Sequence, residues 1–368
     1  MMAALFQPFE LRGLRLANRI VVSPMQTYSA PDGVATAWHR THLARFALGG
    51  AGLVMIEATA VSPEGRSTYV DLGLWNDEQA DCLAVTVEAI RSCGGAAGIQ
   101  LQHAGRKAST SAPWNDFAPV PLKPGIEVIG PTADPASRGG HKPRVMEKAD
   151  MDRLVSAYVD AACRADRAGF DLAEIHMAHG YLLHSFLSPL ANRRSDDFGG
   201  RLENRMRFPL RVVAAVREAW PAEKPLACRI SSVDGVGIGW SLDDSLLLAE
   251  RLRELGVDLV DCSSGGMTLP RKDMLVPRGP GFQVPFAARL RAGADIATIA
   301  VGGITDAVQA DAIVAEGKAD LVAVGRQMLA NPNWGLDAAE ALLTSGRWER
   351  WPVPFGWWLE RRNRASSR

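Results

Sequence analysis

Eight short apolar runs recur along the chain, each bounded by turn-forming residues and separated from the next by a stretch with helical periodicity. The runs are residues 19–24, 52–58, 97–102, 172–177, 225–230, 258–264, 296–303 and 319–326. Short strands that alternate with amphipathic helices, such as 151–170 and 245–256, are typical of parallel βα units. Eight units without a break in composition favour a closed (β/α)8 TIM barrel of the α/β class, with an open α/β sheet as the alternative. We therefore expect a single domain over residues 1–368.

Three regions do not fit the repeating pattern. Residues 1–18 are predicted to form a short hairpin that closes the bottom of the barrel. Residues 104–150, rich in Pro, Gly, Asp and Ser, form a long insertion after the third strand, and such loops commonly cover active sites. The C-terminal tail, residues 340–368, is rich in tryptophan, so we expect it to dock on its own barrel or on a neighbouring subunit.

The composition argues against several classes of function. The chain has 41 basic and 41 acidic residues, so it has no net charge with which to attract nucleic acid or an anionic membrane. It has no apolar stretch of the roughly 18 residues that cross a bilayer, and its N-terminus lacks the apolar segment of a signal peptide. The five cysteines form no CxxC pair, which argues against zinc, an iron–sulfur cluster or disulfides. We expect a cytoplasmic protein that binds small molecules, and neither a membrane nor nucleic acid.

Polar side chains lie at the ends of several predicted strands. They are Gln100, Gln102 and His103 at the third run, His176 and His179 at the fourth, Arg229 at the fifth, and Cys262, Ser263 and Ser264 at the sixth. In a barrel the carboxyl ends of the strands meet on one face, where active sites lie. The sequence therefore predicts an active site on this face. The alternative is that each polar residue only caps its own loop.

Glycines close the last two predicted strands. They are Gly302 and Gly303 after the seventh run, and Gly325, with Arg326 beside it, after the eighth. In barrels these two loops often bind phosphate through backbone N–H groups. Since the chain has no GxGxxG motif and no P-loop, a mononucleotide fits better than a dinucleotide. A flavin would also use an amide and a positive charge at its polar edge, which Gln100 and Arg229 can supply, although each can equally be a satisfied core residue.

Longer motifs resemble the old yellow enzyme family, in its xenobiotic reductase and thermophilic-like branch. They are VVSPMQTYSA, EATAVSPEGR, IQLQHAGRKA, EIHMAHGYLLHSFLSPLANRRSDDFGGRLENRMRF and AVGR. The resemblance implies an ene-reductase with bound FMN and with NADPH or NADH as a transient hydride donor. By a ping-pong cycle it would reduce the C=C bond of α,β-unsaturated carbonyl or nitro compounds. The resemblance also implies a homodimer or homotetramer, in which the tail near Trp358 reaches a neighbouring active site.

The same resemblance implies roles for individual residues. The cofactor would be bound by Ser23, Pro24, Met25, Gln26, Ala58, Gln100, Arg229, Gly302, Gly303, Gly325 and Arg326. The substrate would be bound by Tyr28, His176, His179, Tyr181 and Trp358. Of these, His176 and His179 would bind the substrate oxygen and Tyr181 would donate a proton, which makes the three the catalytic residues. By their spacing alone the two histidines could instead bind a metal with Glu174 or be ordinary loop residues, whereas the resemblance implies no metal.

Other FMN barrels fit the sequence less well. Dihydroorotate dehydrogenases lack an HxxHGY block after the fourth strand, and dihydrouridine synthases need a basic surface. Dienoyl-CoA reductases carry a cysteine cluster for an iron–sulfur centre. A flavin-binding protein without activity is the alternative outside the enzymes.

Gln26 departs from the pattern of the family. The related branch has a cysteine at this position and other branches have threonine, and both residue types contact the flavin. We expect the Gln26 amide to bond the flavin and to tune its potential without the pH response of a thiol. The alternative is that it turns away and bonds the backbone of its own loop.

Overall fold

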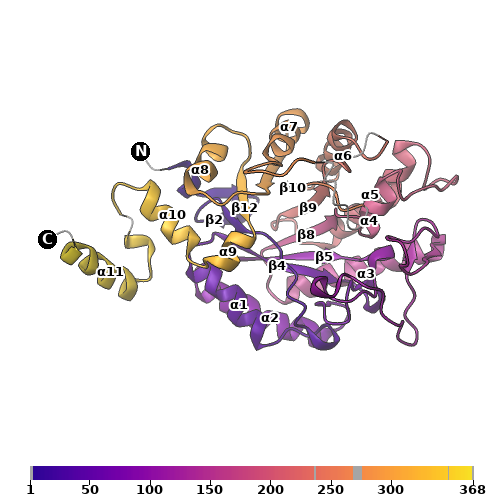
Figure 1. Cartoon of the computed structure of the whole chain (residues 1–368), viewed down its shortest axis with the longest axis horizontal. Coiled ribbons are helices and arrows are strands. Elements are labelled where there is room, and N and C mark those ends of the chain that lie inside the picture. Colours follow the sequence, from indigo (N-terminus) through magenta and orange to yellow (C-terminus); the bar gives the residue numbers. More distant parts are fainter. Residues whose placement is uncertain (1–2, 236–237, 268–275, 347, 367–368) are drawn as a thin grey trace.

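A computed structural model describes residues 3–235, 238–267, 276–346 and 348–366. Eight parallel strands close into a barrel in the order β10-β11-β12-β3-β4-β5-β8-β9, which confirms the predicted TIM barrel (Figure 1). The strands are β3 (Ile20–Val22), β4 (Leu53–Ala60), β5 (Ala96–Gln102), β8 (Leu172–Met177), β9 (Leu226–Ser231), β10 (Leu259–Ser263), β11 (Ala297–Val301) and β12 (Leu321–Val324). The last strand pairs with the first, with Val322 opposite Ile20 and Val324 opposite Val22. The predicted run 296–303 is longer than β11, because the chain turns at Gly302 and Gly303, which have φ of 108° and 68°.

The helices cover the outside of the barrel (Figure 1). They are α1 (Ala37–Leu48), α2 (Asp77–Ser92), α3 (Lys148–Arg167), α4 (Leu182–Leu187), α5 (Leu202–Ala219), α6 (Leu242–Glu254), α7 (Val284–Ala294), α8 (Ala307–Ala315), α9 (Arg326–Ala330) and α10 (Trp334–Leu342). The sequence pattern places the start of α3 too late, because its polar first turn is set by a capping box between Glu147 and Asp150. The helix ends before Gly169, which has a φ of 90°.

Apolar side chains pack in two layers. The larger one lies between strands and helices, where Phe46, Tyr158 and Phe170 are fully buried. The smaller one fills the barrel at the amino ends of the strands and includes Leu53 and Leu172. The hairpin of β1 (Phe9–Leu11) and β2 (Leu14–Leu16) packs against this smaller layer, so the N-terminal residues lie across the bottom of the barrel. The carboxyl ends of the strands are therefore the end that is left for a binding site.

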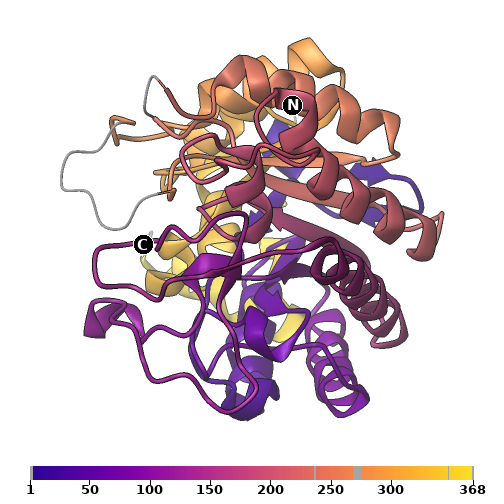
Figure 2. The same ribbon diagram turned by 90° about the vertical axis from the view of Figure 1, so that its right-hand side faces the viewer.

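The insertion after β5 is mostly irregular (Figure 2). Its only regular pieces in the described ranges are η4 (Gly105–Lys107), η5 (Pro113–Asn115), β6 (Ile129–Gly130) and β7 (Arg144–Val145). Trp114 at its tip is 70% exposed, and its ring meets that of Tyr28 edge-on with the centroids 5.3 Å apart. The insertion thus contacts the loop that follows β3.

The C-terminal tail projects from the side of the barrel. After η6 (Trp348–Arg350) it ends in α11 (Val353–Ser366), which stands away from the other helices (Figure 1). Val353 is 84% exposed and Trp358 is 65% exposed. In the part of the chain that the structure describes, no helix is both long enough and apolar enough to cross a membrane.

Candidate active site

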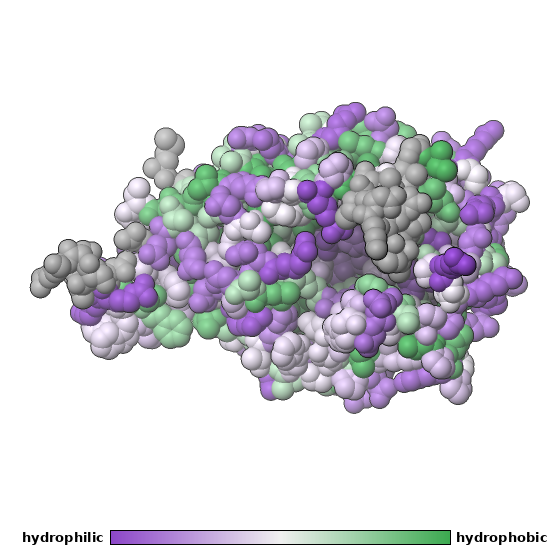
Figure 3. Space-filling view, viewed as in Figure 1, coloured by the Kyte–Doolittle hydropathy of each residue, from purple (hydrophilic) through white to green (hydrophobic). Residues whose placement is uncertain are grey.

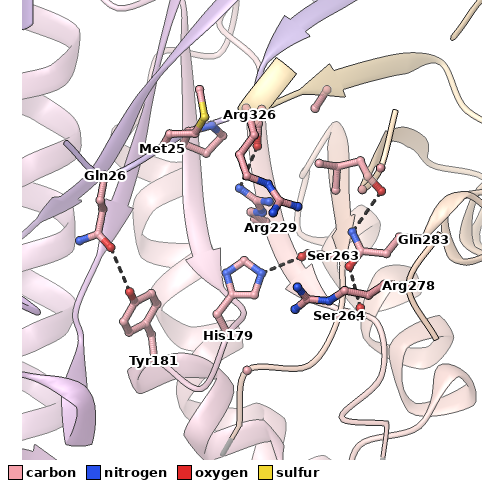
Figure 4. A pocket seen from close by; sticks show the side chains of 18 of the residues that line it. Met25, Gln26, His179, Tyr181, Arg229, Ser263, Ser264, Arg278, Gln283 and Arg326 are labelled. Carbon is pink, nitrogen blue, oxygen red and sulfur yellow. Dashed lines mark hydrogen bonds between the residues drawn. The ribbon is translucent and has the colours of Figure 1, made fainter. Parts of the chain in front are cut away.

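A cavity of about 540 Å³ opens at the carboxyl ends of the barrel strands. Figure 3 shows a hollow near the middle of this face, and Figure 4 shows side chains that line the cavity. The predicted residues among its walls are Ser23, Pro24, Met25, Gln26, Tyr28, His179, Tyr181, Arg229, Ser263, Ser264, Gly302, Gly303, Gly325 and Arg326. These residues follow or belong to β3, β8, β9, β10, β11 and β12, so the fold brings together most of the residues that the sequence singled out.

At one end of the cavity the backbone is exposed because side chains are absent. A Cβ atom on Gly303 would lie 2.3 Å from the carbonyl oxygen of Gly279, and one on Gly302 would lie 2.7 Å from Nε2 of Gln283. Both glycines have positive φ, which other residues rarely adopt. The guanidinium of Arg326 belongs to the same wall. This cradle suits an anionic group such as a phosphate.

Arg229 is the buried positive charge of the cavity. Its Nε lies 3.2 Å from Oδ2 of Asp261 and its Nη1 donates to Oγ of Ser23 at 3.4 Å. Below it, Gln100 donates through Nε2 to Oε1 of Glu174 at 2.7 Å. Burial raises the pKa of Glu174 and Asp261 raises it further, whereas Arg229 opposes this shift. Asp261 therefore holds the Arg229 side chain in place, and the guanidinium can still interact with a ligand in the cavity.

Two neutral histidines lie at the carboxyl end of β8, His176 within the strand and His179 two residues after it. Burial, reinforced by Arg229, lowers the pKa of His176 and of His179 well below the usual value. Nδ1 of His176 accepts from the backbone N–H of Ala178 at 3.2 Å, so the ring hydrogen of the neutral form is on Nε2. His179 has a φ of 59°, and its Nε2 lies 2.7 Å from Oγ of Ser263. The two rings meet edge-on with the centroids 5.2 Å apart.

Tyr181 is the N-cap residue of α4 and lines the cavity beside His179. Its hydroxyl donates to Oε1 of Gln26 at 3.2 Å (Figure 4). Burial raises its pKa to about 12, so it keeps its proton at neutral pH. Its ring packs edge-on against that of His176, with the centroids 5.0 Å apart.

Of the residues assigned to the cofactor or the substrate, four lie outside the walls of the cavity, as do the strand-end residues Gln102, His103 and Cys262. Ala58 is 4% exposed, Gln100 2% and His176 3%, and none of the three belongs to the cavity wall. Trp358 does not line the cavity of its own chain and lies on the exposed α11. Among the described residues no group of three or more His, Cys, Asp or Glu side chains is arranged to hold a metal ion.

Several lining residues were not singled out from the sequence. Lys107 lies in the motif IQLQHAGRKA, and its Nζ donates to the carbonyl oxygens of His179, at 2.5 Å, and Gly266. Burial lowers the pKa of Lys107 to about 7. Behind the same loop, Nδ1 of His184 accepts from the backbone N–H of Gly180 at 2.9 Å, while its Nε2 lies 3.2 Å from Oδ1 of Asp234. Both side chains hold the loop that carries His179 and Tyr181.

The glycine cradle, the buried arginine and the neutral His179 at one opening of the barrel suit a cofactor that carries an anionic group, as in a flavin-dependent oxidoreductase. Residues 4–344 match the NADH:flavin oxidoreductase / NADH oxidase family. An NADPH dehydrogenase of Geobacillus thermodenitrificans (strain NG80-2) is 45% identical over 344 residues, which are 93% of this chain and 95% of the relative. An NADPH dehydrogenase of Listeria monocytogenes serotype 4a (strain HCC23) is 43% identical over 343 residues, or 93% of this chain and 96% of the relative.

Solved structures of other reductases have the same fold as this chain. A structure of morphinone reductase is 29% identical, with a TM-score of 0.77 over 92% of this chain and 90% of that chain. A 2-naphthoyl-CoA reductase, at 23% identity, has a TM-score of 0.82 over 93% of this chain and 53% of its own, and shows the fold alone. The chain belongs to the NADH:flavin oxidoreductase / NADH oxidase family, the old yellow enzymes, and is an FMN-dependent oxidoreductase that uses NAD(P)H.

Proposed function

We propose that this enzyme reduces the C=C bond of α,β-unsaturated carbonyl or nitro compounds, and that NAD(P)H and the alkene occupy the cavity in turn. The observation that carries the proposal is that a neutral histidine, His179, and a protonated tyrosine, Tyr181, face the cavity that also contains the glycine cradle. Such an arrangement binds an oxygen and keeps a proton at hand beside a cofactor.

The residues that would hold FMN are those with the matching chemistry. Gly302, Gly303, Gly325 and Arg326 would take the phosphate, since they share one wall of the cavity and Arg326 adds a positive charge there. Ser23, Pro24, Met25 and Gln26 would line the ring, Arg229 would face its polar edge, and Ala58 and Gln100 would support this wall from behind. When bound, FMN supplies the carrier that accepts a hydride from NAD(P)H and passes it to the substrate.

The protein's own contribution is to bind and orient the substrate. N–H groups of the neutral His176 and His179 would donate to the substrate oxygen and stabilise the negative charge that develops there. Tyr181 would hold the proton that the α-carbon receives. Tyr28 would close the mouth of the cavity together with the insertion, because its ring contacts Trp114.

We further propose a homodimer or homotetramer in which α11 docks on a neighbouring subunit. The supporting observation is the exposure of Val353, Phe355, Trp357 and Trp358, which are 84%, 50%, 46% and 65% exposed in the single chain. Trp358 and Arg361 are the residues of α11 that we assign to the neighbouring active site.

Colour tests the activity directly. The purified protein should be yellow, bleach with NADPH under anaerobic conditions and regain its colour when 2-cyclohexenone is added. Replacing His176 or His179 with Ala should weaken the binding of phenols, which imitate an enolate, while FMN stays bound. Unchanged phenol affinity in both variants would contradict the assignment of the two histidines as ligands of the substrate oxygen.

A further inference from the structure

The side chain of Gln26 is bonded at both ends of its amide. Its Nε2 donates to Oδ2 of Asp71 at 3.0 Å, and its Oε1 accepts from the hydroxyl of Tyr181 at 3.2 Å. Gln26 follows β3, Tyr181 follows β8 and Asp71 lies in the loop after β4, so three separate segments meet here. None of these bonds goes to the backbone of the loop that carries Gln26.

Asp71 sets the direction of this amide. The carboxylate is fully buried, and it accepts from the backbone N–H groups of Ser67 at 2.8 Å and Thr68 at 2.9 Å and from Oγ1 of Thr68 at 2.6 Å. Burial raises its pKa to about 6, and the bonds from Thr68 and Ser67 oppose this rise. At neutral pH it is therefore mostly an ionised acceptor. A flipped amide would place Oε1 of Gln26 against a carboxylate oxygen, which costs a hydrogen bond and adds repulsion.

The fixed amide in turn sets the hydroxyl of Tyr181. An amide oxygen can only accept, so the phenolic hydrogen points at Gln26. The phenolic oxygen also accepts from Oγ of Ser67 at 3.4 Å. The charged and titratable groups around Tyr181 include His176, whose ring it contacts, and Lys107, whose Nζ is 5.7 Å from its ring centroid. Asp71 and Tyr28 are the others. None of these groups accepts its proton, so among the described residues the acceptor of that proton is Gln26.

We propose that Gln26, oriented by Asp71, is a positioning residue that fixes the direction of the Tyr181 hydroxyl and so acts on the protonation of the substrate. This inference rests on the proposed role of Tyr181 as proton donor. Asp71 occupies one of the two Nε2 hydrogens of Gln26, so the amide is already committed to Asp71 and Tyr181 before any ligand enters. Before it protonates the substrate, the Tyr181 hydroxyl must rotate away from Gln26. The bond to Gln26 gives this rotation a single starting orientation.

A double-mutant cycle in the FMN-loaded enzyme tests the proposal. The variants are Gln26→Leu, Tyr181→Phe and the two combined, and the measured step is reoxidation of the reduced enzyme by 2-cyclohexenone. We expect Gln26→Leu to slow this step roughly five- to tenfold, about the effect of one positioning hydrogen bond. In the Tyr181→Phe background the same change should alter the rate less than about twofold. An equal effect in both backgrounds would overturn the proposal.

A second readout does not depend on turnover. The chain has four tyrosines, so ring-labelled tyrosine gives few resonances, and Tyr181→Phe assigns the one that is lost. Gln26→Leu should shift the Tyr181 resonance in the oxidised holoenzyme, and an unmoved resonance would refute the coupling. Gln26→Met repeats both measurements if Gln26→Leu loses FMN. If Tyr181→Phe leaves reoxidation unchanged, the proposed proton donor is wrong, while the resonance still decides whether Gln26 orients Tyr181.

Discussion

Nε2 of His179 lies 2.7 Å from Oγ of Ser263, the last residue of β10. Because burial keeps His179 neutral, only one of its ring nitrogens carries a hydrogen, and the serine hydroxyl can settle which one. If Ser263 donates to Nε2, the hydrogen of His179 is on Nδ1 and is free for a ligand.

Ser263→Ala should therefore weaken phenol binding roughly threefold to tenfold, because the tautomer is no longer fixed. The measurement is a titration of the oxidised holoenzyme followed by its visible absorbance. Ser263→Thr keeps a hydroxyl and serves as the control. Equal phenol affinity in Ser263→Ala and the wild type would show that Ser263 does not set the tautomer.

Gly303→Ala should weaken FMN binding. The added Cβ would lie 2.3 Å from the carbonyl oxygen of Gly279, at a φ of 68° that strains an alanine, so the cradle has to shift. We expect at least tenfold weaker FMN binding, measured by the fluorescence of flavin released on dilution. Gly279→Ala is the matched control, because no heavy atom lies within 4 Å of its added Cβ. Retention of FMN by Gly303→Ala at wild-type affinity would contradict the assignment of the cradle.

Trp358→Ser should disturb assembly if α11 docks on a second subunit. Tryptophan is enriched among interface hot spots, whose truncation costs about 2 kcal/mol or more of binding free energy. Sedimentation velocity should show a smaller species at low protein concentration. Val308→Ser, on α8, removes a side chain that is 63% exposed and should leave assembly unchanged. Removal of all residues from Pro352 onward without any change in assembly or kinetic constants would refute the role of the tail.

Acid should destabilise the fold through its buried histidines. Burial, reinforced by Arg45 and His39, lowers the pKa of His42 to about 4, so between about pH 6.5 and 4 the unfolded chain binds a proton that the folded chain does not. The free energy of unfolding should then fall as the pH falls, by up to about 1.4 kcal/mol per pH unit from this one group.

Denaturant titrations at several pH values measure this slope. His42→Gln lacks the titrating group, so its stability should decline less steeply over the same range. His42 lies on α1 and does not line the cavity, which separates this effect from catalysis. Parallel profiles for the two proteins would mean that His42 is not protonated on unfolding.

The sequence pattern was sufficient to predict the barrel, and the pattern and the family resemblance together pointed to about half of the residues that line its cavity. The period of the apolar residues and the placement of glycines identify strands such as β8, whose predicted and observed bounds agree. The carboxyl ends of such strands must meet once the barrel closes. The partners of Gln26 were not predictable, since Asp71 and Tyr181 lie 45 and 155 positions away along the chain. The sequence pattern also does not show that His176 and Gln100 are buried outside the cavity wall, because this depends on how the strands pack in three dimensions.

The pairing of β12 with β3 has a consequence for synthesis. Arg19, beside the first strand, bonds the carbonyl oxygen of Asp320, beside the last, across 301 positions of the chain. During translation β3 therefore leaves the ribosome long before its partner, and one of its edges has no strand to pair with until residues near Val324 emerge. Since the proposed phosphate cradle joins loops at this same seam, we expect a nascent chain to bind FMN only after the residues near Arg326 have emerged, and flavin uptake would then report closure of the barrel.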